Sequence, residues 1–193
     1  MTKIERNKNR LKEILNIKTK GKLLDIGCGK GELLGLTKDY FDIQGIDISP
    51  IKIIPLIPKF TNKVCVGDIE NMELQQDNYD VVTVFNVLEH LENPNQVVSK
   101  IHKSLKQEGF MIGSVPNNFG VIGKLATRMS NFDTTHISVY SPERWDKVFR
   151  NNGFCEISYF GEIMLYRIGK YLKTKHWRYL SFNLIFICEK NKR

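Results

Sequence analysis

The sequence predicts an α/β fold in which a mostly parallel sheet carries helices on both faces. Short apolar segments rich in β-branched residues alternate with amphipathic segments, which is the pattern of βαβ units. The connections are short, and no internal repeat or low-complexity tract divides the chain. Because one domain usually takes roughly 100–200 residues, we expect residues 1–193 to form a single domain.

Composition narrows the class of protein. The chain is 41% hydrophobic and 26% charged, which is ordinary for a soluble globular protein. No apolar run approaches the ~18–20 residues of a membrane span, and the charged N-terminal segment lacks the apolar stretch of a signal peptide. The four cysteines are far apart, which indicates neither a disulfide framework nor a zinc site. We therefore expect a cytoplasmic protein.

The first half of the chain predicts a helix, then strands separated by turns and helical segments. Residues 3–18, within an N-terminal segment 1–20, space isoleucines and leucines among charges as an amphipathic helix does. After Asp47, Pro55 and Pro58 allow at most one helical turn. We expect the apolar residues of that segment to pack on the sheet or to form a contact surface. Strands are predicted at 22–26, 43–47, 64–66 and 79–85, with a helix opening at 32.

The second half predicts a helix at about 95–107, a strand at 110–115, and a long insertion at 116–140. Ser141 and Pro142 form a typical helix start, and the predicted helix ends near Asn151. Strands follow at 154–160 and 181–189, and residues 162–172 are helix candidates. Within the insertion, helical spacing predicts a short amphipathic helix that forms a lid or acceptor wall, or else packs in the core: Val121, Ile122, Leu125, Ala126 and Met129.

The most informative motif is the turn after the first strand. The residues 23–31 read LLDIGCGKG, and such glycines let the backbone turn sharply beside a ligand. The spacing is G-x-G-x-G, with Asp25 two residues before the first glycine, whereas a dinucleotide site has G-x-G-x-x-G. Asp47 ends the next strand. This pattern resembles the class I S-adenosylmethionine-dependent methyltransferases.

Three further segments carry the same resemblance, so that it covers residues 22–115 in order. They are GDIE at 67–70, YDVVTVFNVLEHL at 79–91 and LKQEGF at 105–110. The resemblance implies a Rossmann-like fold with a seven-stranded, mostly parallel sheet. Its last strand is antiparallel, which fits the two C-terminal strands.

The resemblance also implies S-adenosyl-L-methionine as the cofactor. It places Asp25 near the cofactor's amino group, Asp47 on both ribose hydroxyls and Asp68 near the adenine amine. A carboxylate can accept two hydroxyl hydrogen bonds, and such charge-assisted bonds are strong. The expected cofactor site comprises Asp25, Gly27, Cys28, Gly29, Gly31, Asp47, Ile48, Asp68, Ile69 and Asn86.

A second resemblance concerns catalysis. The segment NVLEH at 86–90 is similar to the E-x-x-E-H element of ubiquinone-biosynthesis O-methyltransferases and small-RNA ribose methyltransferases, which implies metal ligation by Glu89, His90 and His136. Here Asn86 replaces the first Glu, and a neutral amide is a weaker ligand for a hard cation. We therefore expect no stable metal. His136 lies in a segment where related enzymes face the acceptor with a His, so we expect it to be the catalytic base; the alternative is a His bonded to loop backbone.

The expected reaction is O-methylation of a small-molecule, glycan or lipid-linked acceptor. Oxygen is favoured because NVLE at 86–89 replaces the Asn-Pro-Pro-Tyr-like motif of amide or amine methylation. Two alternatives are a non-catalytic cofactor-binding module and an NAD-dependent oxidoreductase. The intact turn argues against the first, and the spacing and lack of an obvious Tyr-x-x-x-Lys pair argue against the second.

The net charge of +8 points to an anionic partner met by the ends of the chain. The first 22 residues hold eight Lys or Arg and two Glu, and residues 166–179 hold five Lys or Arg, several aromatics and no acid. Such a run has three interpretations: a solvated basic face, a surface that contacts an anionic membrane, or a surface that binds RNA. No RNA-binding module accompanies it, so we do not expect nucleic acid. Peripheral contact with anionic lipid is the hypothesis retained.

Overall fold

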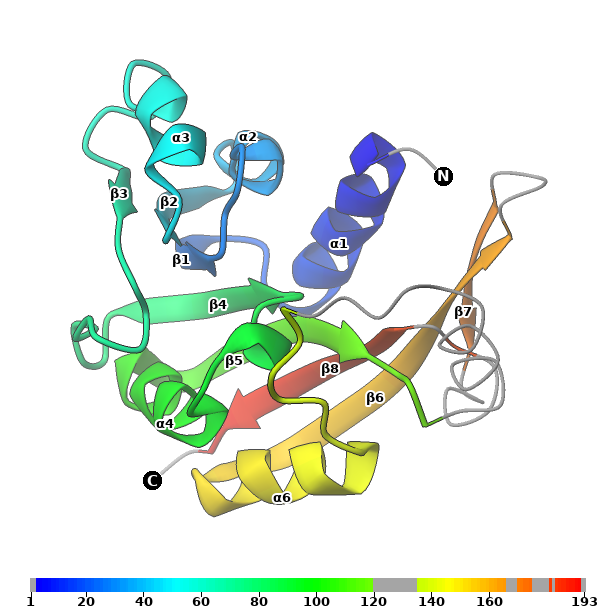
Figure 1. The fold of residues 1–193 in the computed structure, drawn as a ribbon. Helices are drawn as coiled ribbons and strands as arrows, with labels where there is room; N and C mark the ends of the chain where they lie inside the picture. The colour runs from blue at the N-terminus through cyan, green and yellow to red at the C-terminus, as the bar shows by residue number, and fades with distance from the viewer. Residues whose placement is uncertain (1–2, 120–134, 166–169, 175–180, 182, 192–193) are drawn as a thin grey trace.

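A computed structural model of the chain describes residues 3–119, 135–165, 170–174, 181 and 183–191. Its centre is one mixed sheet with the strand order β3-β2-β1-β4-β5-β8-β6-β7 (Figure 1). Neighbouring strands from β3 to β5 pair in parallel, and β8 is antiparallel to both β5 and β6. The strands are β1 (Gly21–Ile26), β2 (Phe41–Asp47), β3 (Val64–Val66), β4 (Tyr79–Phe85), β5 (Leu105–Pro116), β6 (Phe154–Leu165), β7 (Lys170–Thr174) and β8 (Asn183–Lys190).

The predicted seven strands and the antiparallel last strand are confirmed, but the sheet has an eighth strand. The end of β6 pairs antiparallel with β7 between Gly161 and Thr174. The expected helix over 162–172 is therefore wrong. Tyr159, Phe160 and Ile163 continue a run of residues that favour strands, and the ladder gives this stretch the backbone partners that a helix would otherwise supply.

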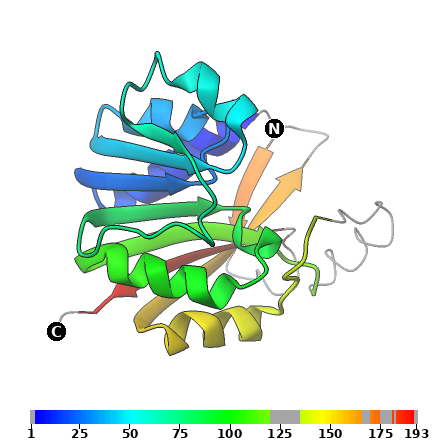
Figure 2. The ribbon, with the colours of Figure 1, turned by 60° about the vertical axis from the view of Figure 1, so that its left-hand side comes forward.

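Helices cover both faces of the sheet, as predicted (Figure 2). On one face, α4 and α6 pack over a core that includes Val97, Trp145 and Phe186. On the other, α1, α2, α3 and the short 3₁₀ helix η1 pack over a core that includes Ile14 and Leu34. The helices are α1 (Lys3–Ile17), α2 (Glu32–Thr37), α3 (Pro50–Ile53), η1 (Ile54–Leu56), η2 (Leu88–His90), α4 (Pro94–Ser104) and α6 (Pro142–Asn151).

Side-chain caps fix where the two long helices on the first face begin. The Asn93 side chain accepts a hydrogen bond from the Gln96 amide at 3.2 Å, and the Ser141 side chain accepts one from Arg144 at 3.3 Å. Each cap satisfies an amide that has no partner inside its helix. Helix α4 ends at Ser104, three residues before the predicted end, because Leu105 is already extended and pairs with Tyr79 of β4.

The segment after β2 confirms the expected single turn of α-helix and adds one 3₁₀ turn. It is apolar on both sides. Ile53, Leu56 and Phe60 are buried against the sheet, whereas Ile51 and Ile54 are exposed. Packing on the sheet is therefore confirmed for part of the segment, and a contact surface formed by its exposed residues stays a prediction.

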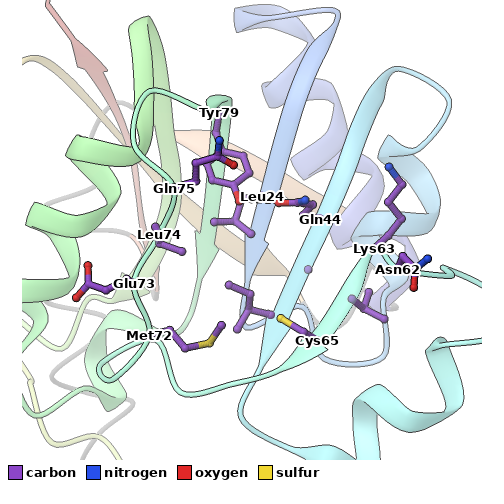
Figure 3. Close-up of a pocket in the computed structure, with 13 residues that line it drawn as sticks. Leu24, Gln44, Asn62, Lys63, Cys65, Met72, Glu73, Leu74, Gln75 and Tyr79 are labelled. Carbon is purple, nitrogen blue, oxygen red and sulfur yellow. Dashed lines mark hydrogen bonds between the residues drawn. The ribbon is translucent and has the colours of Figure 1, made fainter.

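The connection between β3 and β4 contains no helix, although all of residues 67–78 are described. Lys100 of α4 holds this loop: its Nζ donates to the carbonyl oxygens of Glu70 and Met72, each at 2.8 Å. Between the loop and the sheet lies a hollow of about 370 Å³. Figure 3 shows its wall of loop side chains facing Leu24 and Gln44 of the sheet. No residue of the expected site lines it.

Two other expectations have separate outcomes. The helix predicted from Val121 to Met129 lies outside the described residues. Within the described ranges, none of the helices has both the length and the apolar character that crossing a membrane requires.

Candidate functional site: a glycine turn between two carboxylates

The turn after β1 has a backbone that requires glycine. Gly27, Gly29 and Gly31 have φ angles of 73°, 56° and 69°, in the left-handed region that other residues rarely adopt. A Cβ atom on Gly27 would also lie 2.3 Å from the Cγ2 atom of Val87. The amides of Gly27 and Cys28 donate to the Ile46 carbonyl at 2.7 and 3.0 Å, which ties the turn to β2.

Asp47 faces this turn from the end of β2. One of its carboxylate oxygens accepts a hydrogen bond from the Gly29 amide and the other from the Ser49 amide, both at 2.9 Å. Lys52 lies 3.5 Å from the second oxygen. The side chain is buried, and the oxygen that accepts from Gly29 keeps a further lone pair for a hydroxyl donor. The carboxylate is thus held rigidly at the carboxyl edge of the sheet, where open α/β folds bind ligands.

Asp25 is the second carboxylate, and it is buried at the end of β1. Burial raises the pKa of its carboxyl group from 3.8 to about 7, although the hydroxyl of Thr83 and the charge of Arg10 act in the opposite direction. The Thr83 hydroxyl donates to Asp25 at 2.6 Å. A buried carboxyl group with a pKa near neutrality is typical of a site that binds charged ligands.

The N-terminal helix supplies cations to the same site, which the sequence analysis did not predict. A hollow of about 170 Å³ lies between α1, the glycine turn and the end of β4. Arg10 lies 4.1 Å over the Phe85 ring and donates to Asn7 at 3.3 Å. Arg6 also lines the hollow, and its Nε is buried with no hydrogen-bond partner among the described residues. The signal was present as the helical spacing of Lys3, Arg6 and Arg10.

Charges of both signs therefore face one hollow. Asp25 and Glu32 lie on one side, and Arg6 and Arg10 on the other; Glu32 is already paired with Lys3 at 2.7 Å. An amino-acid group, with its ammonium and carboxylate, has the complementary arrangement of charges.

Asn86 connects this hollow to the expected catalytic residues. It follows β4 with a φ of 55°, and its side-chain oxygen accepts a hydrogen bond from the Ser114 hydroxyl. It also lines the hollow beside Phe85. Asn86 is thus held by β5 at the edge of the hollow that the glycine turn also lines.

Glu89, His90 and His136 are brought together by the turn after β4. The ligand atoms of these three residues all lie within 4.8 Å of one another, and the two imidazole rings are 4.8 Å apart at their centroids. The amides of Ile137 and Ser138 donate to the Glu89 carbonyl at 2.9 and 2.8 Å. These backbone bonds hold His136 next to the segment that begins with Asn86.

Thr135 provides two hydrogen-bond partners for the His90 ring. Nδ1 of His90 lies 3.0 Å from the carbonyl oxygen and 3.1 Å from the hydroxyl of Thr135. These two contacts orient the imidazole beside His136 and fit either neutral tautomer, because the carbonyl accepts from a protonated Nδ1 and the hydroxyl can donate to an unprotonated one.

Comparison with known proteins identifies the family. Residues 2–158 match a family described as "Methyltransferase domain". The chain belongs to this methyltransferase family. The resemblance to class I S-adenosylmethionine-dependent methyltransferases is thereby confirmed.

Curated relatives share sequence over part of their length. Over 115 residues the chain is 30% identical to a ubiquinone biosynthesis O-methyltransferase of Photobacterium profundum, covering 53% of this chain and 49% of the relative. It is 31% identical over 119 residues to a protein of the same description from Rickettsia bellii, covering 59% and 48%. The chain thus spans about half the length of the curated relatives it matches.

Solved structures share the fold at lower identity. A SAM-dependent methyltransferase from Archaeoglobus fulgidus superposes with a TM-score of 0.76 at 21% identity, covering 97% of this chain and 94% of the other. A possible histamine N-methyltransferase from Thermotoga maritima gives 0.75 at 16% identity, covering 97% and 92%. These structural similarities show that the chain has the Rossmann-like fold.

The remaining residues expected in the cofactor site of this methyltransferase have different surroundings. The Cys28 side chain is buried in the core beside Gly45, and Ile69 is buried in the opposite core. Ile48 is largely exposed. Asp68 accepts hydrogen bonds from Glu70 and Asn71 of its own loop at 3.0 and 2.6 Å. Of these four, only Cys28 lines the hollow of the turn, and the cofactor-binding roles of all four stay predictions.

Proposed function

We propose that this methyltransferase transfers the methyl group of S-adenosylmethionine to a hydroxyl oxygen of a small-molecule, glycan or lipid-linked acceptor. The observation that carries the proposal is the shared position of two residues after β4: Asn86 lines the hollow of the glycine turn, and Glu89, three residues later, binds the segment that follows His136. This proximity supports His136 as the proton acceptor. The two relatives described above are O-methyltransferases, which supports the choice of oxygen.

In this proposal the protein supplies alignment and a base. Methyl transfer is a displacement in which the acceptor oxygen attacks the sulfonium methyl and the thioether leaves. The acceptor hydroxyl loses its proton to a ring nitrogen of His136 as the new C–O bond forms. Asp25 and the α1 cations hold the amino-acid part of the cofactor, and Asp47 holds the ribose hydroxyls.

The acceptor is found by a mass search. The protein is incubated with metabolite and lipid extracts and with S-adenosylmethionine carrying a deuterated methyl group. A product heavier by one deuterated methyl group identifies the acceptor. Chemical tests for methyl ethers and methyl esters then show whether that group is attached to oxygen. Labelled products formed only on nitrogen or carbon would contradict O-methylation, and titration with S-adenosylhomocysteine separately tests cofactor binding.

Replacing His136 with alanine tests the proposed base. We expect turnover to fall by about 10²- to 10⁴-fold, the usual contribution of a general base, while the Kd for S-adenosylhomocysteine changes less than about twofold. Turnover and calorimetric titration are measured on the same protein preparations. Unchanged turnover would remove His136 from the mechanism.

A metal-assisted mechanism has one observation in its favour, which is the proximity of Glu89, His90 and His136. One carboxylate and two imidazoles form a donor set that suits a transition metal better than Mg²⁺. We propose that no metal is used, because Asn86 supplies a neutral amide in place of a second carboxylate and its oxygen accepts a hydrogen bond from Ser114. Turnover after chelator treatment tests this choice: we expect no loss, whereas loss restored by added Zn²⁺ or Mn²⁺ would establish the metal site.

A further inference from the structure

The segment after β2 exposes a row of isoleucines that nothing in the described chain covers. Ile51, Ile54 and Ile57 are 85%, 60% and 48% exposed. They recur every three residues on α3 and η1, so they form one outward row, which we call the isoleucine ridge. Exposed Pro55 and Pro58 lie between and beside them. Contiguous exposed apolar surface of this kind usually marks a contact site.

The ridge is separate from the packing role of the same segment. Ile53 and Leu56 bury the other side against the sheet. A short helical segment that is apolar all round is normally enclosed by protein. Here only one side is enclosed, so the outward isoleucines belong to neither of the described cores and keep about half or more of their surface in water.

The charged residues of the segment that carries the ridge are all basic. Residues 48–67 contain Lys52, Lys59 and Lys63 and neither Asp nor Glu. Lys59 is exposed, and Lys52 and Lys63 keep 47% and 43% of their side chains exposed while pairing with Asp47 and Asp42. Aliphatic side chains flanked by lysines are typical of surfaces that enter the headgroup region of an anionic bilayer. Lysine stems can extend along apolar surface while the ammonium reaches lipid phosphates.

A protein partner fits this surface less well. Anchor residues of protein interfaces are enriched in Trp, Tyr and Arg, and residues 48–67 contain none of these. Their one aromatic residue, Phe60, is buried. The chemistry of the ridge is therefore aliphatic and cationic, without the features that give a protein interface its specificity.

We propose that the isoleucine ridge is a docking surface for anionic lipid membranes. Ile51, Ile54 and Ile57 enter the interface, and Lys59 with its neighbours contacts the phosphates. Since the ridge begins four residues after Asp47, docking would place the ribose-binding edge of the site close to the bilayer. This surface is independent of the basic segment 166–179 and of the identity of the methyl acceptor.

Vesicle flotation tests the proposal with the full chain. Vesicles of phosphatidylcholine alone are compared with vesicles that also contain phosphatidylglycerol. We expect binding to the anionic vesicles and at least about tenfold weaker binding to the neutral ones. The triple variant Ile51→Ser, Ile54→Ser, Ile57→Ser should lose at least about tenfold in affinity for anionic vesicles, although it retains residues 166–179 unchanged.

Three controls make the result specific. Ile4→Ser, at an isoleucine of α1 that is 63% exposed, should bind as the parent does. Lys59→Glu should weaken binding to anionic vesicles by about fivefold or more and leave the weak neutral binding unchanged. The triple variant should keep its unfolding midpoint and its Kd for S-adenosylhomocysteine, because exposed positions outside the cofactor contacts are changed.

Two results would overturn the proposal. One is equal binding of the parent and the triple variant to anionic vesicles, or no binding by either. The other is a dimer in light scattering that the triple variant abolishes, which would assign the ridge to a second copy of the chain. Failure of methyl transfer would not bear on either result.

Discussion

Asp25 shows how a single buried residue can make cofactor binding depend on pH. Its carboxyl pKa is raised to about 7 by burial, so the folded protein favours the protonated form. The contribution of this group to stability is complete below its ordinary pKa of 3.8 and is lost as the pH rises through about 7. A ligand ammonium next to Asp25 favours the ionised form, and its binding must then release a proton at acidic pH.

We therefore predict that the affinity for S-adenosylhomocysteine falls by about 30-fold between pH 8 and pH 5.5, the ratio of ionised Asp25 expected for a pKa of about 7. Isothermal titration at both values measures it. Asp25→Asn should bind weakly and almost equally at the two pH values. A wild-type affinity that is the same at both would contradict a role for Asp25 in holding the ammonium.

Arg6 lines the same hollow as Asp25, and we expect it to bind the carboxylate of the ligand. We predict that Arg6→Gln weakens S-adenosylhomocysteine binding by at least about tenfold, because a charged hydrogen bond to the ligand carboxylate contributes on the order of 1.5–3 kcal/mol. The decarboxylated analogue should bind the variant and the parent equally. Exposed Lys8→Gln on the same helix is the control, and equal losses for both ligands would exclude a carboxylate contact.

At the scale of elements, the β3–β4 loop depends on a lysine from another element. The Lys100 side chain is only 10% exposed, and its ammonium donates to the two loop carbonyls at 2.8 Å. We predict that Lys100→Met lowers the free energy of unfolding by about 2 kcal/mol, since the carbonyls lose their charged donor. Urea unfolding measures the change.

The matched control is Lys103→Met on the exposed side of α4, which should change stability by less than about 0.5 kcal/mol. Equal stability of Lys100→Met and the parent would show that water replaces the ammonium without cost. If Lys100→Met is less stable than the parent, hydrogen exchange should show reduced protection of the amides in residues 67–78.

The elements also show what local sequence can and cannot predict. The turn with Gly27, Gly29 and Gly31 was found because its positive φ angles demand glycine within a few residues. The Ser141 cap and the short α3 could also be predicted, because Ser and Pro act on the backbone of residues next to them. The contacts of Lys100 and of Arg6 depend on how helices lie across the sheet, so no short pattern reveals them.

At the scale of the whole molecule, the mostly parallel sheet with helices on both faces could be predicted from the alternation of strands and helices, and the family resemblance added the antiparallel last strand. The β6–β7 hairpin was missed because residues 162–172 combine apolar and basic residues in a spacing that suits either helix or strand. The cofactor residues were predicted from motifs, while Ile69 and Cys28 illustrate that a motif position does not specify where a side chain points.

The position of β8 has a consequence for how this chain is made. β8 is late in the sequence but lies inside the sheet, where residues 183–190 pair with β5 on one side and with β6 on the other. During synthesis, β6 and β7 leave the ribosome before the strand that joins them to the rest of the sheet. The cofactor half, from β1 to β5, can pair earlier through its own parallel ladders. We expect the edge of β5 to stay open until β8 emerges, so this is the stage at which a nascent chain most needs protection from wrong strand pairing.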